Sequence, residues 1–125
     1  KDLKLFRPEV IIVKLGTNDS RPDEWVNEDF FYADYLRLVR RMKSISDQVY
    51  LCYPIPPYGD KWKHRDEILR NKVMKVIRRV SKEEKLPVID LYREEMKDSV
   101  NYFPDGIHPT SGGYDIIAKS IYNNL

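Results

Sequence analysis

The chain has 125 residues, of which 42% are hydrophobic and 34% are charged, so its length and composition fit one globular domain. The 22 basic and 20 acidic residues give a net charge of +2 and are interspersed, which does not indicate a nucleic-acid partner. The sequence also contains no apolar run long enough to span a membrane.

The hydrophobic pattern predicts strands and helices that alternate along the chain. The predicted elements are a strand at 10–15, a helix from 27 or 28 to 46, a strand at 48–53, a helix from after Trp62 to 85, a strand at 87–91 and a helix at 111–123. The run Val10–Val13 is β-branched and is typical of a strand buried on both faces of a sheet. This order of elements predicts an α/β fold with a parallel sheet and right-handed crossovers.

Apolar residues at helical spacing predict which side of each helix faces the core. In the first helix these are Phe31, Tyr35, Leu38, Val39 and Met42, and in the second Leu69, Val73, Val76, Ile77 and Val80. In the last helix the residues expected to face inward are Tyr114, Ile117, Ala118 and Ile121.

The segment Asp105-Gly106-Ile107-His108-Pro109 is the first motif with chemical content. An Asp three residues before a His can place its carboxylate on Nδ1–H while Nε2 faces outward. That arrangement is the acid and base half of a hydrolytic triad. A plain turn that leads into the last helix explains the same residues equally well, so the motif alone leaves both interpretations open.

The segment Gly16-Thr17-Asn18-Asp19 follows the first predicted strand, at the edge where open α/β sheets bind ligands. The side-chain amide of Asn18 can donate a hydrogen bond to a developing oxyanion. Gly16 leaves room for a substrate beside the backbone. The alternative is that Asn18 and Asp19 only cap a turn.

Taken together and in this order, the two motifs resemble the SGNH (GDSL-like) hydrolase family, which is named for Ser, Gly, Asn and His. Residues 10–19 are similar to its third block and residues 105–109 to its last block, so the resemblance covers nearly the whole chain. It implies that Asp105 and His108 are the catalytic acid and base and that Asn18 is an oxyanion donor. Among subgroups, the chain is most similar to carbohydrate O-acetylesterases, including sialate O-acetylesterase-like proteins.

The resemblance also implies a three-layer, flavodoxin-like parallel sheet with helices on both faces, of which this chain supplies the last three strands. The block with the Gly-Asp-Ser nucleophile and the block with the oxyanion-hole Gly are absent from the sequence. Residues 1–125 are therefore predicted to be a single partial domain that lacks the N-terminal strand with the nucleophile. Ser20 and Ser111 are the serines expected near His108, and neither is a natural replacement.

The resemblance implies a serine esterase or acylhydrolase that cleaves ester groups, O-acetyl groups above all, from a small molecule or a glycan. The missing N-terminal segment would supply the nucleophile, and this chain alone is predicted to be inactive. The residues assigned to substrate contact are Gly16, Thr17, Trp25 and Trp62. The alternative for both tryptophans is that they cover helix starts.

No metal cluster or cofactor is expected from a chain with two histidines and one cysteine. Without the strand that the resemblance places next to it, Val10–Val13 would form an exposed sheet edge, so the fragment is predicted either to self-associate through this strand or to be ordered only beside its missing half. The alternative function is a non-catalytic glycan-binding or interaction module formed by a truncated domain. The compartment stays open, since a signal peptide upstream of Lys1 would indicate a secreted or periplasmic protein.

Overall fold

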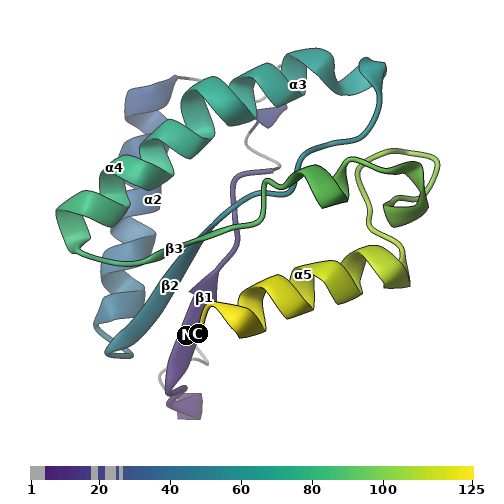
Figure 1. Ribbon diagram of the computed structural model, residues 1–125. Coiled ribbons are helices and arrows are strands. Elements are labelled where there is room, and N and C mark those ends of the chain that lie inside the picture. Colours follow the sequence, from purple (N-terminus) through teal and green to yellow (C-terminus); the bar gives the residue numbers. More distant parts are fainter. Residues whose placement is uncertain (1–4, 18–19, 22–24, 26) are drawn as a thin grey trace.

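The computed structural model describes residues 5–17, 20–21, 25 and 27–125 (Figure 1). Three parallel strands form one sheet: β1 (Val10–Val13), β2 (Gln48–Tyr53) and β3 (Val88–Asp90), in the order β1-β2-β3. Val13 of β1 and Val88 of β3 both pair with Leu51, so β2 is the central strand. The predicted parallel sheet is confirmed, although β1 ends two residues earlier than residue 15.

Helices whose bounds lie within the described residues cover the two faces of the sheet. They are α2 (Glu28–Lys43), α3 (Lys63–Ile68), α4 (Met74–Glu84) and α5 (Ser111–Asn123). Figure 1 shows α2 and α4 on one face and α5 on the other, which confirms the predicted three layers. The short helical turns whose bounds lie within the described residues are η2 (Asp60–Trp62), η3 (Leu69–Val73), η4 (Glu94–Met96) and η5 (Ser99–Asn101).

The helix predicted after Trp62 is present, but it contains one π turn. This turn, η3, joins α3 to α4, and its Leu69 and Val73 are fully buried. Helix α4 ends at its C-cap residue Lys85, which adopts the left-handed conformation with φ 55°. The Leu86 N–H then donates to the Ser81 carbonyl.

Helix α2 begins and ends at residues that satisfy its terminal backbone groups. The Asn27 side chain accepts from the Phe30 N–H at 2.7 Å, which is an N-cap bond. The helix ends at Lys43 instead of the predicted residue 46. Ser46 acts outside the helix, because its hydroxyl donates to the Glu9 carbonyl at 2.5 Å and links the starts of β1 and β2.

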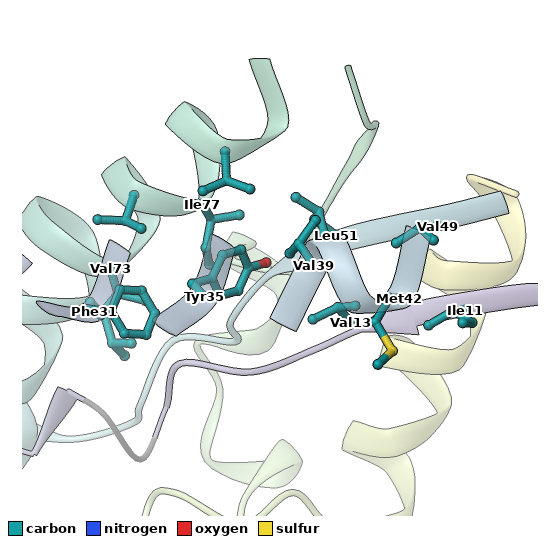
Figure 2. Close-up of a cluster of buried hydrophobic side chains, with 13 residues drawn as sticks. Ile11, Val13, Phe31, Tyr35, Val39, Met42, Val49, Leu51, Val73 and Ile77 are labelled. Atoms are coloured by element: carbon teal, nitrogen blue, oxygen red, sulfur yellow. The ribbon is translucent and has the colours of Figure 1, made fainter. Parts of the chain in front are cut away.

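The larger hydrophobic core lies between the sheet and the helices α2 and α4 (Figure 2). Its buried residues are Ile11, Val13, Phe31, Tyr35, Val39, Met42, Val49, Leu51, Leu69, Val73, Val76, Ile77 and Val80. A smaller core on the α5 face contains Cys52, Ile55, Ile89, Leu91, Met96, Tyr102 and Ile117. Leu51 and Cys52 point to opposite faces of β2 and are both fully buried, because neighbouring side chains alternate along a strand.

Strand β1 is buried on one face only, which corrects the expectation of burial on both. Ile11 and Val13 are buried in the larger core, whereas Val10 and Ile12 are each 37% exposed. The other face of the sheet is covered by α5, but α5 contacts β3, which is the edge strand farthest from β1. The β-branched composition of β1 therefore reflects the strand itself and not two covered faces.

The inward face of α5 also differs from the prediction. Gly113 and Ile117 are buried, as their spacing of four residues on one helical face requires, but Tyr114 is 55% exposed and Ala118 is exposed as well. Each of these two residues follows a buried one and is rotated about 100° around the helix from it. The stripe that packs on the smaller core is thus narrower than the apolar pattern suggests.

Candidate active site

The Asp105–His108 loop is a tight turn between η5 and α5. The Phe103 N–H donates to the His108 carbonyl at 2.9 Å, and the Gly106 N–H donates to the Phe103 carbonyl at 2.9 Å. Gly106 has φ +74°, a conformation that other residues rarely adopt. The chain then enters α5 at Thr110, whose hydroxyl accepts from the Gly113 N–H at 3.3 Å.

Asp105 and His108 form a hydrogen-bonded pair, as their spacing predicts. His108 Nδ1 lies 2.5 Å from Asp105 Oδ2. An ionised carboxylate only accepts hydrogen bonds, so the shared proton belongs to Nδ1 and the lone pair of the neutral ring is on Nε2. The His108 side chain is 71% exposed, and no described residue hydrogen-bonds to Nε2. The neutral ring therefore keeps an unpaired nitrogen on an exposed side chain, which is the geometry that a general base requires.

The carboxylate of Asp105 is stabilised in its charged form. Its Oδ1 accepts from the backbone N–H groups of His108 and Ile107, both at 2.9 Å. Hydrogen bonds hold the pKa of Asp105 well below its usual range. The largest effect comes from the backbone N–H of His108, followed by the backbone N–H of Ile107 and then by the His108 ring. This carboxyl can thus orient His108 at every pH at which the neutral ring is a base.

A second loop, after β2, holds the Asp105–His108 loop in place. The indole N–H of Trp62 donates to the Asp105 carbonyl at 2.6 Å, and the Tyr58 N–H donates to the Gly106 carbonyl at 2.7 Å. A Cβ at Gly106 would lie 2.1 Å from the Tyr58 carbonyl oxygen. Glycine is therefore required at position 106 by the close approach of the two backbones as well as by its φ.

The Gly16–Ser20 loop follows β1 and is anchored by an arginine. Arg65, which is 7% exposed, donates from Nη2 to the Thr17 carbonyl at 2.8 Å and from Nε to the Ser20 hydroxyl at 3.1 Å. The Ser20 hydroxyl in turn donates to the Thr17 carbonyl at 2.5 Å. The carbonyl of Thr17 thus accepts from two side chains.

Two of the residues predicted in this loop can be placed. Gly16 is buried with φ +119°, and a Cβ there would lie 2.7 Å from Val73 Cγ1, so packing against η3 requires a glycine. Thr17 is half-buried. Asn18, the predicted oxyanion donor, and Asp19 lie outside the described residues.

The two tryptophans predicted to contact substrate have different surroundings. Trp25 is half-buried and packs against Phe31, with ring centroids 5.8 Å apart, at the margin of the larger core. Trp62 is half-buried beside the Asp105–His108 loop and lines a surface hollow of about 460 Å³. Tyr58, Asp60 and Asp66 also line this hollow. Their roles toward a substrate stay predictions.

The two serines expected near His108 are not equally accessible. Ser20 is fully buried, and both of its hydrogen bonds tie it to Thr17 and Arg65. Ser111 is exposed at the first position of α5. Ser20 is thus a structural residue of its loop, and its buried hydroxyl does not face a substrate.

Arg65 is the site residue that the sequence analysis missed. It occupies a position four residues before Leu69 and eight before Val73, on the same buried stripe of the helix. An arginine on an apolar stripe is a signal of a buried hydrogen-bonded role, since an arginine is almost never fully buried without partners.

Other kinds of site are not found in the described part of the chain. No group of three or more His, Cys, Asp or Glu side chains there could hold a metal ion. Within those same residues, none of the helices has the length and apolar character needed to cross a membrane.

Comparisons with known proteins extend this picture. The model of the GDSL-like lipase/acylhydrolase family matches residues 1–116. An acetylxylan esterase of Xylanibacter ruminicola is 27% identical over 140 residues, which cover 97% of this chain and 29% of that protein.

Solved structures share the fold at low sequence identity. A lipase/acylhydrolase from Enterococcus faecalis superimposes with a TM-score of 0.80 at 22% identity, over 96% of this chain and 62% of that one. A catalytic mutant of an acetylxylan esterase from Geobacillus stearothermophilus does so with a TM-score of 0.79 at 17% identity, over 98% of this chain and 62% of that one. The chain thus spans less than two thirds of the length of each of these relatives.

Proposed function

The chain belongs to the GDSL-like lipase/acylhydrolase family, and from this premise we propose that it is the part of a serine esterase that bears the catalytic acid and base. The observation that carries the proposal is the 2.5 Å pair of His108 Nδ1 and Asp105 Oδ2, with Nε2 turned outward. A turn that only led into α5 would not need a histidine held in one tautomer by a carboxylate.

The mechanism follows from this pair. A serine hydroxyl attacks the ester carbonyl carbon while His108 Nε2 takes its proton, and Asp105 stabilises the resulting imidazolium. The tetrahedral oxyanion accepts hydrogen bonds, one of them from the predicted donor Asn18. His108 then protonates the leaving alcohol as the carbon–oxygen bond breaks. Water attacks the acyl-serine with His108 as base, which releases the acid and restores the serine.

The nucleophile is proposed to come from a segment outside this sequence. Ser20 is buried and hydrogen-bonded, so it does not reach a substrate. We propose that residues 1–125 form one partial domain without the Gly-Asp-Ser strand, and that this chain alone does not turn over esters.

The proposed substrate is an O-acetylated carbohydrate. Acetylxylan esterases are among the proteins to which the chain is similar. The hollow beside the Asp105–His108 loop is lined by the aromatic residues Tyr58 and Trp62 and by the acidic residues Asp60 and Asp66. Aromatic faces with a few polar groups at their margin suit a sugar ring of the leaving alcohol.

The test uses the longer protein and the 125-residue chain side by side. The longer protein is expected to hydrolyse p-nitrophenyl acetate and acetylated xylo-oligosaccharides and to be labelled on serine by a fluorophosphonate, whereas the short chain does neither. His108→Ala in the longer protein is expected to lower kcat by about 10⁴-fold or more. Unchanged ester turnover in His108→Ala would overturn the assigned base.

The substrate proposal has a test of its own. Tyr58→Ala keeps the backbone N–H that bonds to Gly106 but removes a ring from the hollow. It is expected to raise KM for acetylated xylo-oligosaccharides about tenfold, which corresponds to about 1.4 kcal/mol, and to leave KM for p-nitrophenyl acetate unchanged, because the small acetyl ester does not reach the hollow. Equal effects on both substrates would contradict a sugar subsite there.

The alternative function, a non-catalytic glycan-binding or interaction module, predicts the opposite pattern. Such a module would bind acetylated xylo-oligosaccharides in a calorimeter without hydrolysing them, and His108→Ala would leave that binding intact.

A further inference from the structure

We propose that Arg65 and Trp62 are positioning residues that together connect the two loops of the site, Gly16–Ser20 and Asp105–His108. The inference rests on the proposed function, because that function gives the two loops their catalytic roles. The two loops follow different strands and are far apart in the chain, so their relative position has to be set by contacts between them and a third element. The segment η2–α3 is that element.

Arg65 is the connection to the Gly16–Ser20 loop. Its Nη2 and Nε lie 2.8 and 3.2 Å from the Thr17 carbonyl oxygen, and Nε also lies 3.1 Å from the Ser20 hydroxyl. A buried guanidinium is stable only when its N–H groups are bonded, so the loop has to keep these acceptors in place. These bonds therefore restrain Thr17 and Ser20, the described residues on either side of the sequence segment that contains the predicted oxyanion donor Asn18.

Trp62 is the connection to the Asp105–His108 loop. Its indole N–H donates to the Asp105 backbone carbonyl at 2.6 Å. His108 is the more exposed of the two side chains in the Asp105–His108 pair, so packing against the core does not hold it in place. A hydrogen bond from a half-buried indole to the backbone of the acid therefore restrains the base through the acid.

The two connections meet on one helical turn. Arg65 and Trp62 are three residues apart, and the Arg65 Cζ atom lies 5.3 Å from the centroid of the Trp62 ring. At this spacing the guanidinium and the ring are neighbours on one side of the helix and attract each other. A displacement of Arg65 is thus transmitted to Trp62, and from there to Asp105.

The chain contains a matched pair away from the site. The Arg79 Cζ atom lies 3.7 Å from the centroid of the Tyr32 ring, and both side chains hydrogen-bond to Glu83. This pair joins α2 to α4 and touches neither loop. It provides controls of the same chemistry, an arginine on an aromatic ring, without a connection to the acid or the base.

The test is a double-mutant cycle in the longer, esterase-active protein. Trp62→Phe keeps the ring beside Arg65 and removes only the donor to Asp105, and Arg65→Met removes the donors to Thr17 and Ser20. Each is expected to lower kcat on p-nitrophenyl acetate about tenfold with KM within about twofold, since small misplacements of a catalytic group cost up to about a hundredfold. Arg65→Lys, which keeps the charge and one donor, is expected to recover part of the loss.

The cycle also tests whether the two residues act as a unit. The double variant Trp62→Phe, Arg65→Met is expected to lose about tenfold to thirtyfold, clearly less than the hundredfold product of the single losses. Tyr32→Phe and Arg79→Met are expected to leave kcat unchanged. Independent, multiplicative losses, a change in KM instead of kcat, or an equal loss in the control variants would overturn the inference.

A second readout does not depend on esterase activity. The proton between His108 Nδ1 and Asp105 gives a downfield NMR signal when it is protected from exchange. In Trp62→Phe and in Arg65→Met this signal is expected to broaden, and in the two control variants to persist. If the parent protein hydrolyses no ester, the proposed function fails while this signal still decides the positioning role; if the signal is equally sharp in all variants, the positioning role fails.

Discussion

Both carboxylate oxygens of Asp105 contact His108. Oδ2 lies 2.5 Å from the ring nitrogen Nδ1, and Oδ1 accepts a hydrogen bond from the His108 backbone N–H at 2.9 Å. The second bond fixes the carboxylate plane within the turn, so the first one has a defined direction. The pair is therefore set up within the single turn Asp105–His108, and only the position of that turn depends on the rest of the fold.

The first prediction concerns the charge of this acid. Asp105→Asn keeps an oxygen for the backbone N–H groups but places a neutral amide at Nδ1, so His108 no longer holds its proton there. We expect kcat on p-nitrophenyl acetate to fall about 10⁴-fold, with a small change in melting temperature. Asp98→Asn is the control, because Asp98 also accepts a backbone N–H, that of Val100, in a turn without a histidine partner.

The second prediction concerns the acid limb of stability. The pKa of Asp105 is lowered in the folded state, so its carboxylate favours folding above its unfolded pKa of about 3.9, and this contribution is lost as the pH falls toward the folded value. Denaturant titrations at pH 7 and pH 3 should show the difference in unfolding free energy between the native protein and Asp105→Asn shrinking with falling pH. A difference that grows on acidification would contradict the direction of the shift.

The third prediction concerns the alkaline limb. Burial raises the pKa of the Cys52 thiol to about 11, and its side chain is fully buried. A raised pKa in the folded state favours folding below the unfolded value of about 8.5, and this contribution is lost as the pH rises through about 11. The stability difference between the native protein and Cys52→Ala should shrink between pH 8 and pH 11. At pH 8 the thiol should react with a maleimide only as fast as the protein opens.

The fourth prediction compares two neighbouring glycines at the start of α5. A Cβ at Gly113 would lie 2.4 Å from the Asn101 carbonyl oxygen, whereas one at Gly112 would meet only the Thr110 hydroxyl at 3.8 Å. Gly113→Ala is expected to cost about 1–3 kcal/mol through overpacking, and Gly112→Ala to stabilise by up to about 1 kcal/mol through helix propensity. Urea unfolding of both variants measures this, and equal effects would mean that α5 does not approach Asn101 so closely.

The fifth prediction concerns the edge of the sheet. In the described part of the chain β1 pairs only with β2, and the exposed Val10 and Ile12 lie beside an apolar groove that Phe6 and Leu15 also line. An unpaired apolar edge pairs with other strands, so we expect the 125-residue chain to self-associate at high concentration. Light scattering should detect the association and its loss in Ile12→Lys. Val100→Lys, at an exposed apolar residue of η5, is the control and should not change the mass.

Much of the fold and the central pair of the site could be predicted from the sequence, because both depend on short spacings. The β-branched runs and the apolar positions at helical spacing predict three parallel strands and the helices between them, which the structure has. The pairing of Asp105 with His108 is a contact within one turn, three residues apart, so it follows from local geometry.

What depends on contacts between distant segments was decided by the tertiary structure alone. The exposure of Val10 and Ile12 on one face of β1, and of Tyr114 on α5, depends on which element covers each face, which no local pattern contains. The hydrogen bonds of Arg65 to Thr17 and of Trp62 to Asp105 span 48 and 43 residues. These hydrogen bonds form because η2–α3 packs between the two loops. A buried donor has to be hydrogen-bonded, and the tertiary fold determines which acceptor lies within bonding distance.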